Sequence, residues 1–134
     1  YYTYHPESGE VATVTSPANE QALVAQTRYT YKQYYANYYH ADGTKKSSLD
    51  PIWLLSSESF CANSAASGDG CSAGDEVITT YEYNHDNLHL TAVIVTAKNA
   101  LGAPETQRTC FQYDKYGNQV GEISPLANLS SCPN

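Results

Sequence analysis

Basic residues are scarce in this sequence, and it contains no long apolar run. Seven Lys and Arg face fourteen Asp and Glu, giving a formal net charge of -7. Nucleic acid binding requires a basic surface, so we expect no nucleic-acid partner. No apolar stretch approaches the length of a membrane-spanning helix, so we expect no span. Tyr1–Tyr4 lack the charged and apolar regions of a signal peptide, which we expect to be absent or already removed.

Large apolar residues are also few. Leu, Ile, Val and Phe together number 22 of 134 residues, and methionine is absent. Combined with the net charge, that scarcity would favour disorder. Thirteen tyrosines and twelve threonines argue against disorder, because both favour strands, and tyrosine buries a ring while its hydroxyl stays in water. We therefore expect a thin folded protein, a sheet covered by Tyr and Thr.

The four cysteines are Cys61, Cys71, Cys110 and Cys132, and no two have Cys-x-x-Cys spacing. Zinc sites, haem attachment and thioredoxin-type chemistry therefore lack their pattern. An even number in a short chain favours structural disulfides and an oxidising compartment. Three pairings are possible. Cys61 and Cys71 flank a loop of small residues, so we favour Cys61–Cys71 and Cys110–Cys132, each stabilising by about 2–4 kcal/mol.

Strand patterns dominate over helical ones. The best helix candidate, residues 19–26, is short and could equally lead into a strand. Alternating or β-branched segments separated by short turns predict an all-β antiparallel meander. The expected strands are residues 11–15, 27–31, 51–57, 76–83, 90–98, 106–114 and 118–124. We treat residues 1–134 as one β-rich module with little helix, in which residues 58–75 form a cysteine-bearing loop.

A corner motif recurs along the chain and is clearest in "TCFQYDKYGNQVGEISP", residues 109–125. A tyrosine ends one strand, Gly or Asn supplies the turn, a short strand returns, and proline ends it. The repeats span approximately residues 1–24, 27–57, 76–98 and 106–125. The motif residues are Tyr4, Gly9 and Pro17; Tyr39, Gly43 and Pro51; Tyr83 and Asn87; and Tyr113, Asp114, Gly117 and Pro125.

The stretch "QYDKYGNQVGEISP" resembles a YD repeat of the RHS family, which includes bacterial RHS proteins, toxin-complex shells and teneurins. Residues 3–17 and 80–95 look like looser copies, and residues 51–83 resemble a cysteine-bearing insertion of some large bacterial RHS proteins. The resemblance implies a β-scaffold rolled into a shell, at a bacterial surface or secreted, rather than an active site. Only Tyr113-Asp114 keeps the tyrosine-acid pair, and 134 residues are too few to close a shell.

Chemical motifs are weak. His85, Asp86 and His89 allow a metal or acid-base interpretation, but no third ligand is placed by the sequence, so we favour a polar turn. The acids are dispersed, and Gly-x-Ser-x-Gly is missing. We expect no enzymatic activity, no catalytic residues, no metal and no cofactor.

Tyrosines are the best candidates for a binding or assembly surface. They can stack on sugars or pack against protein, or simply cover a thin sheet. The first residues, "YYTY", carry no charge or proline to block a sheet edge, so we expect strand addition between copies and fibres. The expected function is a structural module whose partner is itself or the rest of a larger RHS-like chain, with glycan-binding adhesion as the alternative. The candidate residues are Tyr1, Tyr2, Tyr4, Tyr29, Tyr31, Tyr34, Tyr35, Tyr38 and Tyr39.

Overall fold

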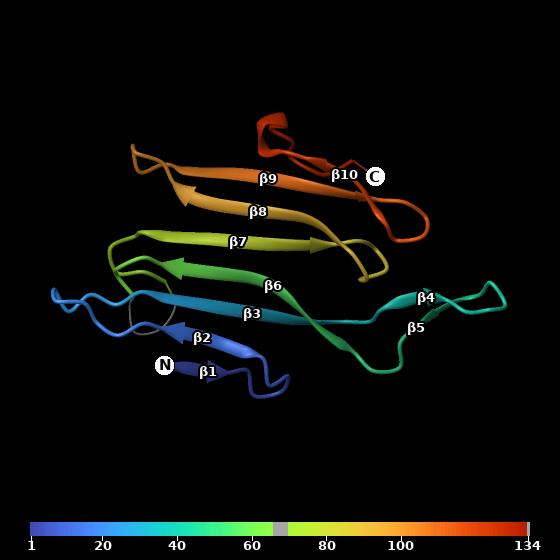
Figure 1. The fold of residues 1–134 in the computed structure, drawn as a ribbon, viewed down its shortest axis with the longest axis horizontal. Helices are drawn as coiled ribbons and strands as arrows, with labels where there is room; N and C mark the ends of the chain where they lie inside the picture. The colour runs from blue at the N-terminus through green and yellow to red at the C-terminus, as the bar shows by residue number, and fades with distance from the viewer. Residues whose placement is uncertain (66–69, 134) are drawn as a thin grey trace.

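The computed structural model describes residues 1–65 and 70–133, which form one antiparallel sheet of eight strands and a separate two-stranded hairpin (Figure 1). The sheet order is β1-β2-β3-β6-β7-β8-β9-β10, and β4 pairs with β5. The strands are β1 Tyr2–Tyr4, β2 Val11–Thr15, β3 Gln26–Tyr34, β4 Asn37–Tyr39, β5 Lys45–Ser47, β6 Ile52–Cys61, β7 Glu76–Tyr83, β8 Leu90–Lys98, β9 Pro104–Tyr113 and β10 Gln119–Ile123. The all-β antiparallel prediction is confirmed. A 3-10 turn, η1 Pro125–Ala127, is the one helical element among the described residues.

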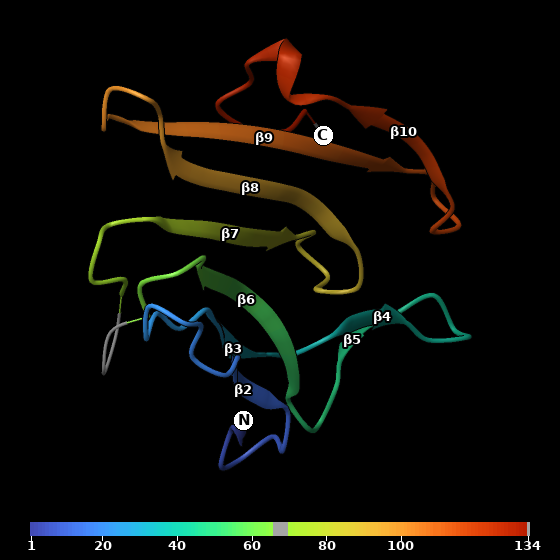
Figure 2. The same ribbon diagram turned by 60° about the vertical axis from the view of Figure 1, so that its left-hand side comes forward.

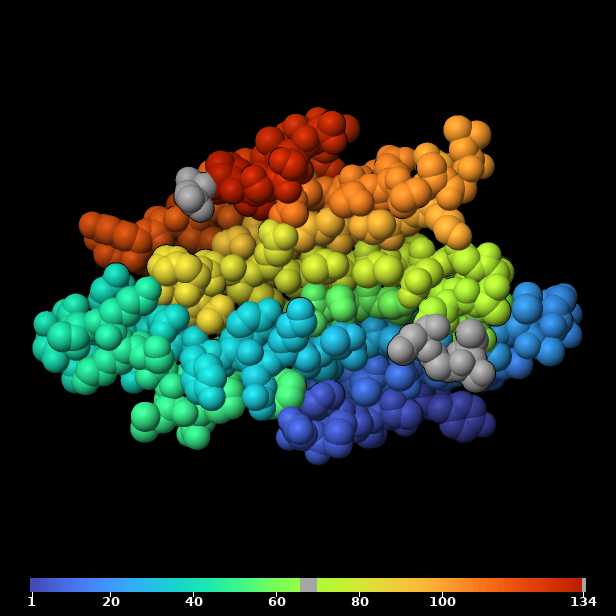
Figure 3. Space-filling model, turned by 180° about the vertical axis from the view of Figure 1, so that it is seen from behind, coloured from blue at the N-terminus to red at the C-terminus, as the bar shows by residue number. Residues whose placement is uncertain are grey.

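The sheet is open, and the expectation of a rolled sheet is wrong. In the described part of the chain, β1 pairs only with β2 and β10 pairs only with β9. Rolling requires the sheet to curve round until its edges approach each other, whereas β1 and β10 lie at opposite sides of a twisted sheet (Figures 1 and 2). Seen from behind, chain-order colours cross the molecule from one edge to the other, so successive hairpins lie side by side (Figure 3).

The protein has a very small buried core, as its composition predicts. Among the described residues, the buried apolar side chains are Cys61, Ala92, Ile94 and Cys110. Cys61 and Cys110 are also the largest side chains that are completely buried. Both belong to disulfides, Cys61–Cys71 and Cys110–Cys132, which is the pairing that the sequence favoured. The core of this single-layer sheet is therefore built largely from its two crosslinks.

The repeat positions lie in hairpin turns. All four turn residues have a positive φ: 74° at Gly9, 81° at Gly43, 57° at Asn87 and 84° at Gly117. The N–H of the last three donates to the carbonyl of the residue that follows the motif tyrosine, at 2.8, 2.8 and 3.0 Å. The first turn is one residue longer, since Gly9 N–H donates to the His5 carbonyl at 2.9 Å.

The helix candidate at residues 19–26 is wrong, because this segment is a hairpin turn that leads into β3. The Asn19 carboxamide oxygen accepts the N–H groups of Gln21 and Leu23 at 3.0 and 2.9 Å. Such side-chain bonds compete with helical backbone bonds. The Ala22 N–H donates to the Asn19 carbonyl at 2.9 Å, and Ala22 has a φ of 60°. Ala22 therefore occupies the position that Gly or Asn fills in the repeat corners.

The β8–β9 turn has the same construction, although the sequence motif did not identify it. Gly102, with a φ of 78°, donates its N–H to the Asn99 carbonyl at 2.9 Å. The Asn99 side chain accepts the N–H groups of Leu101 and Ala103 at 3.0 and 3.1 Å. The tyrosine of the motif is replaced here by Lys98, which concealed the turn.

Two expected boundaries need correction. The cysteine-bearing loop does not begin at residue 58, because β6 continues through Cys61 in register with both β3 and β7. The segment 27–57 is not one simple hairpin either. β3 and β6 form the longest ladder of the sheet, and the β4–β5 hairpin is inserted between them and projects from the sheet (Figure 1).

Replacing Ala22 with glycine should stabilise the protein by about 0.5–1 kcal/mol. A non-glycine residue at positive φ costs about 1–2 kcal/mol, which exceeds the entropic cost of glycine. The matched change is Gly102→Ala, where no heavy atom lies within 4 Å of the added Cβ, so only backbone strain is tested. We expect it to destabilise by about 1 kcal/mol in chemical denaturation. A loss of stability in Ala22→Gly would contradict this account of the turn.

Candidate functional site

Three tyrosine hydroxyls bridge adjacent strands of the sheet. Each hydroxyl donates to a main-chain carbonyl of the neighbouring strand. The bonds run from Tyr31 Oη to the Val11 carbonyl at 3.1 Å, from Tyr83 Oη to the Leu55 carbonyl at 2.8 Å, and from Tyr113 Oη to the Leu90 carbonyl at 2.9 Å. We call these contacts the tyrosine bridges. The motif tyrosines Tyr83 and Tyr113 thus act through their hydroxyl groups as well as through their rings.

Each tyrosine bridge lies at a β-bulge. The β1–β2 register skips Ala12, the β3–β6 register skips Ser56, and the β7–β8 register skips Thr91. In every case the accepting carbonyl belongs to the residue immediately before the skipped one. A bulge interrupts the ladder and leaves backbone groups unpaired. On the other side of each bulged strand, the ladder with the tyrosine's own strand ends two residues before the accepting carbonyl, and the tyrosine hydroxyl supplies a donor there.

Partial burial accompanies these contacts. Burial raises the pKa of Tyr31, and the nearby Glu10 carboxylate raises it further. Burial likewise raises the pKa of Tyr83, whose ring lies 5.9 Å from that of Tyr34. The Tyr113 ring stacks on His89 at 4.7 Å. The raised pKa values keep the Tyr31 and Tyr83 hydroxyls protonated and able to donate at any physiological pH.

Another half-buried tyrosine, Tyr81, lies on β7. Burial raises its pKa to about 12, with a smaller contribution from the Glu58 carboxylate on β6. Its hydroxyl is therefore a hydrogen-bond donor rather than a general base at neutral pH.

The tyrosines proposed as one binding surface do not lie together. Tyr29, Tyr31 and Tyr34 belong to β3 in the middle of the sheet and are half-buried. The remaining candidates are exposed, and they divide among the β1 edge, the segment after β3 and the projecting β4 strand. The exposed ones are Tyr1, Tyr2, Tyr4, Tyr35, Tyr38 and Tyr39.

The turn between β7 and β8, which contains His85, Asp86 and His89, contacts the β4–β5 hairpin through Asp86. The Asp86 carboxylate lies 2.5 Å from Lys45 Nζ on β5 and 3.3 Å from His85 Nε2. The Asp86 carbonyl also accepts the Asn37 N–H at 2.8 Å. The Lys45 ammonium, followed by His85, lowers the pKa of Asp86. Within residues 1–65 and 70–133, no group of three or more His, Cys, Asp or Glu is arranged to hold a metal ion.

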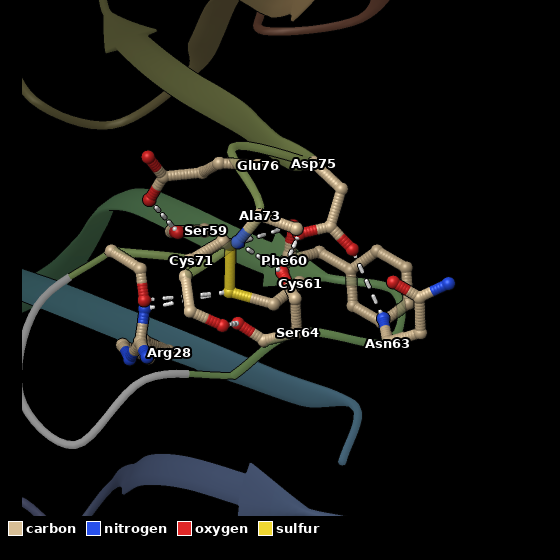
Figure 4. Close-up of a disulfide and its surroundings, with 12 residues drawn as sticks. Arg28, Ser59, Phe60, Cys61, Asn63, Ser64, Cys71, Ala73, Asp75 and Glu76 are labelled. Carbon is tan, nitrogen blue, oxygen red and sulfur yellow. Dashed lines mark hydrogen bonds between the residues drawn. A yellow bond between two sulfur atoms is a disulfide. The ribbon is translucent and has the colours of Figure 1, made fainter. Parts of the chain in front are cut away.

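The loop closed by Cys61–Cys71 is organised by one carboxylate (Figure 4). Asp75 accepts hydrogen bonds from the Ser64 hydroxyl and from the Asn63 N–H, the latter at 3.1 Å. Ser64 in turn accepts the Ala73 N–H at 3.0 Å. The Ser64 hydroxyl lowers the pKa of Asp75 most, and backbone N–H groups add to it. Asp75 is thus a structural residue of the crosslinked loop.

A groove of about 970 Å³ lies between the C-terminal segment and the ends of β7, β8 and β9. The acids that line it, Glu82 and Asp114, are both engaged. Glu82 binds the Arg108 guanidinium through both carboxylate oxygens, at 2.6 and 3.1 Å. Asp114 accepts the N–H groups of Tyr116 and Asn118 at 2.8 and 3.0 Å. The groove therefore offers no free pair of carboxylates of the kind that glycoside hydrolysis uses.

Comparisons with protein-family models, with curated proteins and with solved structures found no match to this chain. The likeness to the RHS repeat is therefore carried by the residues of the motif alone and stays a prediction. No helix in the described ranges is long and apolar enough to cross a membrane.

Removing a bridge hydroxyl should weaken the fold. Tyr83→Phe and Tyr113→Phe each leave a carbonyl without its donor, and we expect each to lower the free energy of unfolding by about 1 kcal/mol. Tyr39→Phe is the matched control, because Tyr39 is 71 % exposed and its hydroxyl meets solvent. Urea denaturation measures all three. An equal loss in all three variants would show that the bridges contribute nothing specific.

Asp114 should contribute to acid sensitivity. Bonds from the Asn118 side chain and then its N–H lower the pKa of Asp114 below the ordinary 3.8. Its contribution to stability is therefore complete above pH 3.8 and disappears as the pH falls through the lowered folded pKa. Asparagine fills the same turn position at Asn84 and Asn99. We expect Asp114→Asn to keep the turn and to flatten the fall in stability below about pH 4. An unchanged acid limb in the variant would refute the assignment.

Proposed function

We propose that this chain is a non-enzymatic structural module, a single-layer β-scaffold that grows by accepting further strands at its open edges. The observation that supports this most is the eight-stranded sheet, whose two edge strands have no further strand beside them in the described part of the chain. Unpaired edges offer N–H and C=O groups to other strands unless they are blocked.

The β1 edge is poorly protected against strand addition. Tyr1, Tyr2 and Tyr4 are 88 %, 63 % and 62 % exposed, and β1 contains neither charge nor proline. The Tyr1 ammonium donates to the Thr15 carbonyl at 2.7 Å, which holds this segment extended along β2. An ordered, uncharged and aromatic edge of this kind is suited to pairing with another chain.

The number of strands supports assembly of identical copies. Eight alternating strands leave β1 and β10 running in opposite directions, so β1 of one copy would add antiparallel to β10 of the next. A head-to-tail contact of this kind does not close, and repeated addition yields fibres. In a longer chain of the RHS type, the same edges would join neighbouring repeats of one polypeptide.

The compartment follows from the crosslinks. Two disulfides in a small chain favour an oxidising environment, and we propose secretion or display at the cell surface. The bacterial assignment rests on the RHS resemblance. Glycan binding has less support, because the exposed tyrosines lie in separate parts of the structure rather than in one groove.

Deleting Tyr1–Tyr4 should abolish self-assembly while leaving the subunit folded. We expect the intact chain to form concentration-dependent polymers in sedimentation velocity experiments, and the deletion variant to remain monomeric with both disulfides intact by peptide mapping. Lysine at Tyr2 and Tyr4 should have the same effect, because edge charges block pairing. Tyr39→Lys, in the projecting hairpin, is the control and should still polymerise. A monomeric intact chain at high concentration would refute self-assembly.

A further inference from the structure

A fourth bulge lies in β10, at the open edge of the sheet. The β9–β10 register runs from Gln119↔Tyr113 to Gly121↔Gln112 and so skips Val120. Bulges thus occur in β2, β6, β8 and β10, that is, in every second strand across the sheet. In the first three, the strand on the far side of the bulge supplies a tyrosine bridge. Among the described residues, β10 has no strand on its far side.

Gln119 is the β10 counterpart of the three carbonyls that accept a tyrosine hydroxyl. Like them, it directly precedes the skipped residue of its strand. The Asp114 N–H donates to the Asn118 carbonyl at 2.9 Å, so these two residues form a hydrogen-bonded pair. Hydrogen-bonded and non-hydrogen-bonded pairs alternate along an antiparallel ladder, so the next pair, Tyr113 and Gln119, is not hydrogen-bonded. The Gln119 carbonyl therefore points away from β9. Gln119 and Val120 are both exposed, Val120 by 65 %.

The three existing bridges obey one register rule. The β8–β9 ladder ends at Ala92↔Cys110. Counting two residues further along each strand places Leu90 opposite Gln112, which is the residue before Tyr113. The same step beyond Ser57↔Thr80 places Leu55 opposite Glu82, the residue before Tyr83. Beyond Thr13↔Arg28 it places Val11 opposite Thr30, the residue before Tyr31. The rule therefore specifies where a tyrosine must stand on any strand added to β10.

The described part of the C-terminal segment, up to residue 133, makes no backbone hydrogen bond to this edge. After β10 the described backbone bonds are local, from Ala127 to Ser124 and from Asn128 to Pro125. The chain then returns to the face of the sheet, where Cys132 is bonded to Cys110 of β9. In Figure 2, β10 accordingly lies at the outer limit of the sheet.

We propose that the β10 edge is a docking site for a separate extended segment that ends in tyrosine, whose hydroxyl donates to the Gln119 carbonyl. The segment pairs antiparallel with β10, and its tyrosine stands one residue beyond the position opposite Gln119. Its length matches the strands that carry the existing bridges, β3, β7 and β9, which have 9, 8 and 10 residues. This inference rests on the strand addition proposed above, but it names a segment longer than the three-residue β1, and that segment would compete with β1 of another copy for the β10 edge.

A synthetic peptide of residues 104–118 with Cys110→Ser is the probe, because it carries β9, its tyrosine and the turn that follows. The matched control peptide adds Tyr113→Phe and lacks only the hydroxyl. We expect the fluorescent probe to bind the intact 134-residue chain and the phenylalanine peptide to bind about two- to tenfold more weakly, as one hydrogen bond provides. Equal binding of the two peptides would overturn the proposal.

Hydrogen exchange locates the contact. By alternation from the Gly121↔Gln112 pair, the Glu122 N–H faces the open edge, and we expect the bound probe to slow its exchange. Glu122→Pro removes this donor without touching the β9 ladder, and it should abolish binding while peptide mapping still finds both disulfides. Protection along β1 in place of β10 would overturn the assignment of the edge.

The result of the peptide-binding experiment is independent of the result of the self-assembly experiment. A monomeric chain that binds the tyrosine peptide at β10 refutes fibres and supports the docking edge. A polymerising chain that does not discriminate between the two peptides supports the scaffold function and refutes the tyrosine rule.

Discussion

The structure depends on satisfying backbone hydrogen bonds in a sheet that has only one layer. A carbonyl released by a bulge in such a sheet is left without a ladder partner, and little apolar side-chain burial is available to offset the loss. Tyr31, Tyr83 and Tyr113 each donate a hydroxyl to such a carbonyl. Each of these tyrosines is also half-buried, so one residue type both donates the hydrogen bond and buries its ring on the sheet.

The disulfides carry much of the remaining stability. Cys61 and Cys110 are the largest completely buried side chains among the described residues; Cys61 ends β6, and the Cys110–Cys132 crosslink ties the segment after β10 to β9. A crosslink stabilises chiefly by restricting the unfolded chain, which suits a module with too little apolar surface to form a thick core.

The same features explain why the edges matter. In β2, β6 and β8, the carbonyl before the bulge accepts a tyrosine hydroxyl from the next strand of the sheet. A bulged strand therefore needs a strand on both sides to satisfy this carbonyl. Gln119 occupies that position at β10, where the described sheet stops. This incompleteness supports the proposal of growth by strand addition, because an added strand would supply both the ladder bonds and the missing hydroxyl.

The sequence by itself determined the all-β class, the antiparallel hairpins and the disulfide pairing, because alternation, turn residues and loop composition act over short distances. It placed a short connection after residue 98 but missed the turn at Asn19, where Ala22 adopts a positive φ that residue preference does not indicate. Only the tertiary structure decided that the sheet is open, which tyrosines are bridges and which are exposed. Those outcomes depend on register between strands, and a bulge that shifts register by one residue leaves no local trace in the sequence.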